Sequence, residues 1–276
     1  MTSAASNELR ARDRRLPLGA RTYVMAILNL TDDSFSHDGT GRDLDAALRR
    51  AVQAAQDGAD IIDVGAESTR PGAAPVPADL ERRRLLPVLE ALAGKVSVPV
   101  SVDTMKAQVA RESLERGVSI VNDVWGFQKD GEMAALCAEA GAGCVLMHNR
   151  LIQDQGDLAE EIPAFLARSA GMARSAGVGE DQILLDPGIG FGKTAEESFA
   201  AVRLIPRIRE MGYPVLVGPS RKRFLGAATG RPVEERALAT AAAAVSCAML
   251  GADVIRVHDV GAVVEALKVA DAVLYP

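Results

Sequence analysis

Eight short apolar runs along the 276-residue chain each lead into polar side chains that could bind a ligand. One polar residue after a strand could simply meet water, but eight in succession, of mixed chemistry, predict a common site. The set consists of Asn29, Asp63, Arg70, Asp103, Asn122, His148, Asp186, Ser220, Arg221, Lys222, Arg256 and His258.

The charges of these residues indicate two kinds of contact with the ligand. Cationic donors suit a phosphate or pyrophosphate; they are Arg70, Arg221, Lys222, Arg256 and His258. Carboxylates and an amide suit a partner rich in N–H groups; they are Asp63, Asp103, Asn122 and Asp186. We therefore expect a ligand with an amide-like heterocycle and an anionic tail.

Several other chemistries are disfavoured by what the chain contains. Its three histidines form no HxH or HExxH pair, which argues against a zinc hydrolase. The glycine-rich stretch at residues 188–194 is not a P-loop, because Pro187 stands where GxxxxGK[ST] needs glycine. We interpret it as a turn that lets a flat ligand approach the backbone. A purely structural turn into the next helix is the alternative.

The apolar runs alternate regularly with segments of helical spacing. In the first such segment Leu44, Ala47, Ala51 and Ala55 belong to one apolar stripe, and Gly58 offers a stop. Continuous apolar strands between helices indicate a parallel sheet buried on both faces. Eight units predict a single (β/α)₈ TIM barrel, whose strand ends share one rim; an open doubly wound sheet is the alternative. The expected strands are 23–28, 61–64, 98–102, 119–121, 144–147, 183–185, 215–217 and 254–256.

Further helices are expected at 78–93, 105–116, 132–139, 158–176, 195–211, 234–250 and 262–272. We assign residues 21–276 to the barrel domain and residues 1–20 to a flexible N-terminal leader, with a barrel-closing segment as the alternative for the leader.

Composition restricts the partners and the compartment. The net charge of −6 argues against nucleic-acid binding, which usually uses a basic face. No run of about 18 uncharged apolar residues is present, so we expect no membrane segment. The three cysteines lie in apolar segments without a CxxC pair, as in a reducing compartment. Together with the lack of an apolar signal region, this predicts a cytoplasmic protein.

The motifs at the strand ends resemble, in order, those of the dihydropteroate synthase family, from about residue 24 to residue 274. They are ILNLTDDSFS at 27–36, DIIDVGAESTRPG at 60–72, SVDT at 101–104, VNDV at 121–124, LMH at 146–148, LDPGIGFGK at 185–193, GPSRK at 218–222 and RVHDV at 256–260. The resemblance implies condensation of 6-hydroxymethyl-7,8-dihydropterin pyrophosphate with para-aminobenzoate, giving 7,8-dihydropteroate and pyrophosphate. It also implies a homodimer and a sulfonamide target.

The resemblance further implies a role for each matching residue. The pterin would meet Asp103, Asn122, Asp186 and Lys222, with apolar contacts from Met147 and Phe191. Mg²⁺ would bind at Asn29, and the pyrophosphate at Thr69, Arg256 and His258. The aminobenzoate would lie beside Arg70, Pro71 and Ser220, and Asp63 and Gly218 complete the substrate-binding set. Of these residues, those expected to act in catalysis are Asp103, Lys222, Arg256 and His258.

Three rival hypotheses remain at this point. A pterin-dependent methyltransferase shares the barrel and the pterin-binding aspartates, but it should lack the Ser220 to Lys222 motif. A non-catalytic pterin-binding paralogue is conceivable because Asp32 replaces the proline usual in the first loop. A Schiff-base aldolase would use Lys222 as its nucleophile.

Overall fold

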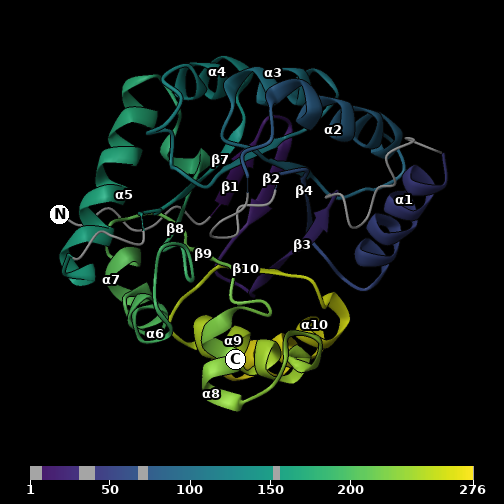
Figure 1. Cartoon of the computed structure of the whole chain (residues 1–276). Helices are drawn as coiled ribbons and strands as arrows, with labels where there is room; N and C mark the ends of the chain where they lie inside the picture. The colour runs from purple at the N-terminus through teal and green to yellow at the C-terminus, as the bar shows by residue number, and fades with distance from the viewer. Residues whose placement is uncertain (1–7, 31–40, 68–73, 152–155, 276) are drawn as a thin grey trace.

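The computed structural model describes residues 8–30, 41–67, 74–151 and 156–275. Its central feature is an eight-stranded parallel sheet in the order β8-β7-β6-β5-β4-β3-β10-β9 (Figure 1). A parallel bridge between Leu185 and Val215 links its two edges, so the sheet closes into the predicted barrel rather than an open sheet. The strands are β3 (Tyr23–Asn29), β4 (Ile61–Gly65), β5 (Val100–Asp103), β6 (Ile120–Asp123), β7 (Gly143–Met147), β8 (Ile183–Asp186), β9 (Leu216–Val217) and β10 (Val254–Val257).

Helices surround this barrel and cover the outer face of the sheet (Figure 1). They are α1 (Gly41–Gln56), α2 (Ala78–Leu92), α3 (Ala107–Glu115), α4 (Met133–Ala140), α5 (Leu158–Ser175), α6 (Ala195–Arg203), α7 (Ile205–Arg209), α8 (Arg223–Thr229), α9 (Ala237–Met249) and α10 (Val260–Leu274), with 3₁₀ turns at Glu180–Gln182 and Val233–Glu235. The predicted helix 195–211 is two helices, because Pro206 has no N–H with which to continue the backbone ladder. Helix α8 was not predicted.

Hydrophobic side chains fill the layer between the barrel and its helices. The predicted stripe of α1 is buried at Ala47 and Ala51, whose small side chains let the helix approach the strands closely. The strands themselves are almost wholly buried, as their continuous apolar sequences indicated. The core therefore holds the strand ends rigidly in place.

Residues 8–18 of the leader are not a flexible tail but the barrel-closing segment that was the alternative expectation. They form an antiparallel hairpin of β1 (Glu8–Ala11) and β2 (Arg14–Pro17). Its buried residues Leu9, Ala11, Leu16 and Leu18 alternate along the chain, a strand period that was present in the sequence. They form one cluster with side chains from the strands, namely Tyr23, Met25, Ile61, Ile120, Val145, Leu184, Leu216 and Val254. The hairpin thus closes the barrel at the amino-terminal ends of the strands.

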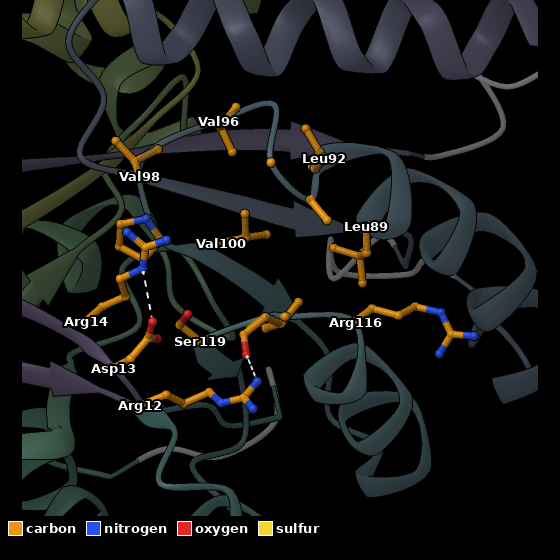
Figure 2. A pocket seen from close by; sticks show the side chains of 15 residues that line it. Arg12, Asp13, Arg14, Leu89, Leu92, Val96, Val98, Val100, Arg116 and Ser119 are labelled. Carbon is orange, nitrogen blue, oxygen red and sulfur yellow. Dashed lines mark hydrogen bonds and ion pairs between the residues drawn. The ribbon is translucent and has the colours of Figure 1, made fainter.

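A hollow of about 520 Å³ lies beside the hairpin, at the same end of the barrel (Figure 2). Its wall combines apolar side chains such as Val98 and Val100 with the charged side chains of Arg12, Arg14 and Arg116. Arg12 Nη1 donates to the carbonyl oxygens of Leu114, at 2.7 Å, and Val118, at 3.1 Å. These bonds tie the hairpin to the end of α3 and to the segment that follows it, and we therefore assign Arg12 a structural role.

No helix in the described ranges is long and apolar enough to span a membrane.

Candidate active site

The carboxyl ends of the central strands bring three of the predicted site residues onto neighbouring positions. Asp103 of β5 is in register with Asn122 of β6 and with Gly65 of β4, which in turn is in register with Asn29 of β3. A Cβ on Gly65 would lie 3.2 Å from the Cβ of Asp103. Glycine at this position therefore leaves room for the aspartate side chain.

Arg256, from the end of β10, lies between two aspartates. Its Nε donates to Asp63 Oδ2 at 2.6 Å, and its Nη2 donates to Asp103 Oδ2 at 2.8 Å. Asn122 Nδ2 also donates to Asp63 Oδ2, at 3.0 Å. Asp63 is fully buried, and its Oδ1 has no hydrogen-bond partner among the described residues. Asp63 thus orients both an arginine and an amide toward the barrel mouth.

Burial in this cluster changes the protonation of Asp103. It raises the pKa of Asp103 to about 7, although the nearby Arg256 acts to lower it; Asp63 raises it further. For Arg256 burial acts to lower the pKa, but the charges of Asp63 and Asp103 outweigh it and raise the pKa. The guanidinium is therefore always charged, while Asp103 exchanges a proton near neutral pH.

A second acid–base pair, Asp186 and Lys222, faces the same mouth. Asp186 is buried, and its Oδ1 accepts a hydrogen bond from Gly188 N at 2.7 Å. No donor within the described ranges reaches its Oδ2, so that oxygen is free for a ligand. Burial raises the pKa of Asp186 against the effect of Lys222. Burial also lowers the pKa of Lys222 to about 8, against the attraction of Asp186.

The glycine-rich turn follows Asp186 and reaches over to Lys222. Lys222 Nζ donates to the carbonyl of Ile189 and lies 4.4 Å from the centroid of the Phe191 ring. Gly188 and Gly192 have φ of +66° and +58°, and a Cβ on either would overlap a backbone carbonyl of the segment after β7. Packing against the segment after β7 therefore requires these two glycines.

The sequence matches the pterin binding enzyme family over residues 25–258. It is 45% identical over 258 residues to the dihydropteroate synthase of Clostridium beijerinckii, covering 93% of this chain and 96% of that one. The dihydropteroate synthase of Clostridium difficile, solved in the presence of pteroic acid, superposes with a TM-score of 0.91 at 42% identity over 95% of this chain and all of that one. The enzyme of Xanthomonas albilineans with 4-aminobenzoic acid also gives 0.91, at 40% identity and 97% and 98% coverage.

The chain belongs to the dihydropteroate synthases.

Membership of this family confirms the fold and the resemblance read from the strand-end motifs. It sets aside the methyltransferase and aldolase hypotheses, because the relatives at 40–46% identity are dihydropteroate synthases.

Ser220 and His258 lie together beside the cluster, on the loops after β9 and β10. Ser220 Oγ is 3.0 Å from His258 Nδ1 and accepts a hydrogen bond from His258 N at 3.1 Å. Ser220 is buried, whereas His258 is exposed. The pair is thus placed where a buried hydroxyl and an exposed imidazole could meet different parts of one ligand.

Arg221 takes a different position from the one predicted. Its guanidinium forms a bidentate pair with Asp259, with Nε 2.9 Å from Oδ2, instead of standing free for a phosphate. Asp259 directly precedes α10, but its side chain makes no capping bond to that helix. Arg221 also has a φ of +55°, and its backbone N–H donates to Thr240 Oγ1. The contacts of Arg221 with Asp259 and Thr240 together fix the loop that carries Lys222.

The other predicted residues lie as follows. Met147 is buried and in register with Asp186. Gly218 faces Arg256, since a Cβ there would lie 3.8 Å from the Arg256 Cβ. Asn29 is partly buried at the end of β3. Thr69, Arg70 and Pro71, like Asp32, lie outside the described residues.

Sequence reasoning missed a partly buried group of titratable side chains behind the glycine-rich turn. It comprises His148, Arg150, Glu161, Lys193 and Glu197. His148 was included in the predicted common site, and it lies in this group instead. No sequence signal linked the two glutamates to this place, because they come from the first turns of α5 and α6.

Proposed function

We propose that the chain condenses 6-hydroxymethyl-7,8-dihydropterin pyrophosphate with para-aminobenzoate, giving 7,8-dihydropteroate and pyrophosphate for folate biosynthesis. The observation that carries this proposal is the meeting of Asp103, Asn122, Asp186 and Lys222 with Arg256 at one barrel mouth. Acceptors for a nitrogen-rich ring thus stand beside a cation for its leaving group. Relatives of the same fold have been solved in the presence of pteroic acid and with 4-aminobenzoic acid.

The pterin would bind at the Asp186 side of the mouth. The free Oδ2 of Asp186 can accept N–H bonds from the amino-pyrimidinone edge, and charge assistance strengthens such bonds. Asn122 is held by Asp63 and can contribute its amide oxygen. Phe191 and the buried Met147 supply apolar contact to the ring. Lys222, whose pKa is lowered to about 8, gives a cation that is still mostly protonated at pH 7.

The reaction breaks the carbon–oxygen bond between the pterin methylene and the pyrophosphate. The electron pair leaves with the pyrophosphate, the arylamine nitrogen forms the new carbon–nitrogen bond, and that nitrogen then loses a proton. Arg256 and His258 would stabilise the departing negative charge, and an ionised Asp103 the methylene that becomes cationic. Ser220, Arg70 and Pro71 would border the aminobenzoate, and Thr69 the pyrophosphate. No nucleophilic side chain is needed.

Mg²⁺ would bind at Asn29, together with the pyrophosphate. Asn29 lies partly buried at the end of β3, in register with Gly65, and its side chain offers an amide oxygen of the kind that this ion prefers. The described ranges contain no group of three histidine, cysteine or acidic side chains suited to hold a metal. Mg²⁺ typically keeps several waters and uses substrate phosphates as ligands. A single protein oxygen, from Asn29, is therefore compatible with an Mg²⁺ site. The ion would supply charge neutralisation at the leaving group.

The test measures pyrophosphate release with and without para-aminobenzoate. We expect release that depends on the arylamine and is abolished by Lys222→Ala and by Asp186→Ala, with circular dichroism unchanged. Titration with the pterin pyrophosphate alone should show weaker binding in both variants. Pterin binding without any turnover would instead support the non-catalytic paralogue. Wild-type activity in either variant would contradict the site assignment.

We also propose that the chain forms a homodimer through α9 and α10, which lie side by side at the carboxyl-terminal part of the barrel (Figure 1). Large apolar side chains are exposed on these helices, at Leu238 (83%), Met249 (51%), Val269 (68%) and Val273 (69%). Such a concentration is unusual for a surface that faces only water. The three buried free cysteines support a cytoplasmic location.

A further inference from the structure

Lys193 ends the glycine-rich turn and directs its side chain back underneath it. Its Nζ lies 2.8 Å from the carbonyl oxygen of Gly188, 3.1 Å from that of Phe191 and 2.9 Å from His148 Nδ1. A lysine ammonium has three N–H donors and no acceptor. The three neighbours therefore use all of its donors, and only the protonated side chain can satisfy them together.

The tautomer of His148 follows from this arrangement. Because the ammonium can only donate, His148 Nδ1 must accept, and the ring proton must lie on Nε2. Nε2 is 3.2 Å from Glu161 Oε1, to which it can donate. Burial lowers the pKa of His148 to about 3, and the charges of Lys193 and Arg150 lower it further. A neutral His148 thus connects Lys193 to helix α5.

Arg150 completes the support of the turn from the same side. Its Nε donates to the carbonyl of Gly192 at 2.9 Å. Its Nη1 pairs with Glu161 at 3.1 Å, and its Nη2 pairs with Glu197 of α6. The carbonyls of three residues of the turn, at positions 188, 191 and 192, are therefore each held by a cation.

The opposite side of this turn carries groups assigned to the pterin. Gly188 N donates to Asp186, the carbonyl of Ile189 accepts from Lys222, and the Phe191 ring lies beside Lys222 Nζ. A change in the path of the turn would move all of these contacts together. The charged group beneath the turn is therefore linked to the site through the backbone.

We propose that Lys193 is a positioning residue, whose protonated ammonium, braced by neutral His148, holds the turn in the shape that binds the pterin ring. It acts through the turn's carbonyls and through Phe191 and does not itself touch the substrate. This inference rests on the proposed pterin chemistry and concerns affinity for the pterin rather than the bond-breaking step.

The geometry predicts a dependence on pH. Burial lowers the pKa of Lys193 to about 7; Lys222 and Arg150 lower it further, while Asp186 and Glu161 act to raise it. His148, the remaining charged or titratable neighbour, stays neutral. Above this pKa the amine keeps two N–H donors, so one of its three acceptors faces a lone pair. Pterin affinity should hence be complete at low pH and fall as the pH rises through about 7.

Other groups in the site titrate nearby, namely Asp103 at about 7 and Lys222 at about 8. The wild-type profile alone therefore cannot assign the effect to Lys193. The comparison of the wild-type chain with Lys193→Met removes this ambiguity, because Asp103 and Lys222 titrate in both proteins.

The experiment measures pterin pyrophosphate binding by calorimetry and steady-state kinetics between pH 6 and 9. For Lys193→Met we expect the pterin Kd and KM to rise roughly tenfold at pH 6.5, in line with the loss of charged hydrogen bonds. The value of kcat and the KM for para-aminobenzoate should change less than threefold. Lys193→Gln, with two N–H donors, should lie in between. Lys95→Met, at an exposed lysine, is the matched control.

The pH profile gives the readout that a merely structural role would not move. Lys193→Met should lose the part of the fall in affinity that Lys193 causes, so the ratio of its pterin Kd to that of the wild type should shrink as the pH rises through about 7. Equal Kd values, or parallel profiles, for the variant and the wild type would overturn the proposal. So would failure of both Lys193 variants to fold, which would assign the residue to stability. If the wild-type chain itself did not bind the pterin, the proposed function would fail instead.

Discussion

Substitution of Asp103 by asparagine should stabilise the protein while removing its activity. Asparagine has nearly the shape of a protonated aspartate, and it can still accept the hydrogen bond from Arg256 Nη2. The substitution therefore fixes the position in the neutral form that the buried site favours. The gain in the free energy of unfolding should depend on pH, because wild-type Asp103 is itself neutral at low pH.

The pKa of Asp103 gives the size of this effect. Burial raises it from 3.8 to about 7 in the folded chain. Since the folded state holds this proton more tightly, the contribution of Asp103 to wild-type stability is complete below pH 3.8 and is lost as the pH rises to about 7. A shift of one pKa unit corresponds to about 1.4 kcal/mol of folding free energy, so a shift of roughly three pKa units corresponds to about 4 kcal/mol. The asparagine variant should exceed the wild type by about 2 kcal/mol at pH 5 and by about 4 kcal/mol at pH 8.

Urea unfolding of both proteins at pH 5 and pH 8, followed by circular dichroism, measures this difference. Other titrating groups contribute equally to both chains and cancel in the comparison. The dependence of the unfolding free energy on urea concentration should be the same for both proteins, so the difference in stability appears as a shift of the unfolding midpoint. Pyrophosphate release should fall by at least a hundredfold, the usual scale for one lost electrostatic contact. A variant less stable than the wild type at pH 8, or a gap independent of pH, would refute the reasoning.

Three further predictions concern the hairpin, the turn and the helical surface. Leu9→Ala should lower the free energy of unfolding by about 2–5 kcal/mol, because Leu9 is buried in the barrel plug; a loss below about 1 kcal/mol in denaturant unfolding would contradict the plug. Gly188→Ala should strongly reduce soluble yield, since its Cβ would overlap the His148 carbonyl. Gly94 also has a positive φ, +73°, but open space around it, so Gly94→Ala should lower the free energy of unfolding by only about 1 kcal/mol. Equal soluble yields for Gly188→Ala and Gly94→Ala would count against the packing argument. Val273→Glu should convert the proposed dimer to a monomer in light scattering, and an unchanged mass would exclude α10 from the interface.

The strand ends could be predicted from sequence because their signal is local. Asp103 and Asp186 each end an apolar run, and parallel strands bring such ends to one rim whatever the loops do. The hairpin was also visible in principle, since Leu9 and Ala11, and then Leu16 and Leu18, are two positions apart, as in a strand with one buried face. Arg12 and Arg14, which flank the turn of the hairpin, gave this segment a charged composition that favoured a leader instead.

The charge pairs behind the site could not be predicted in the same way. Arg221 meets Asp259 across 38 positions, and Arg150 meets Glu197 across 47. These pairings depend on which loops and helices become neighbours after the barrel closes. Composition and periodicity carry no information on such long-range choices. A lysine after a glycine-rich turn, such as Lys193, looks the same whether it faces water or the interior.

The hairpin that closes the barrel also has a consequence for synthesis of the chain. Leu16 leaves the ribosome early, whereas Val254, a member of the same apolar cluster, follows 238 positions later. At about 5–20 residues per second, translation of that interval takes roughly 10–50 s. During this time the nascent amino terminus has an apolar face without its final partners. We expect the last quarter of the polypeptide to set the moment of folding, and chaperones to shield the leading segment until then.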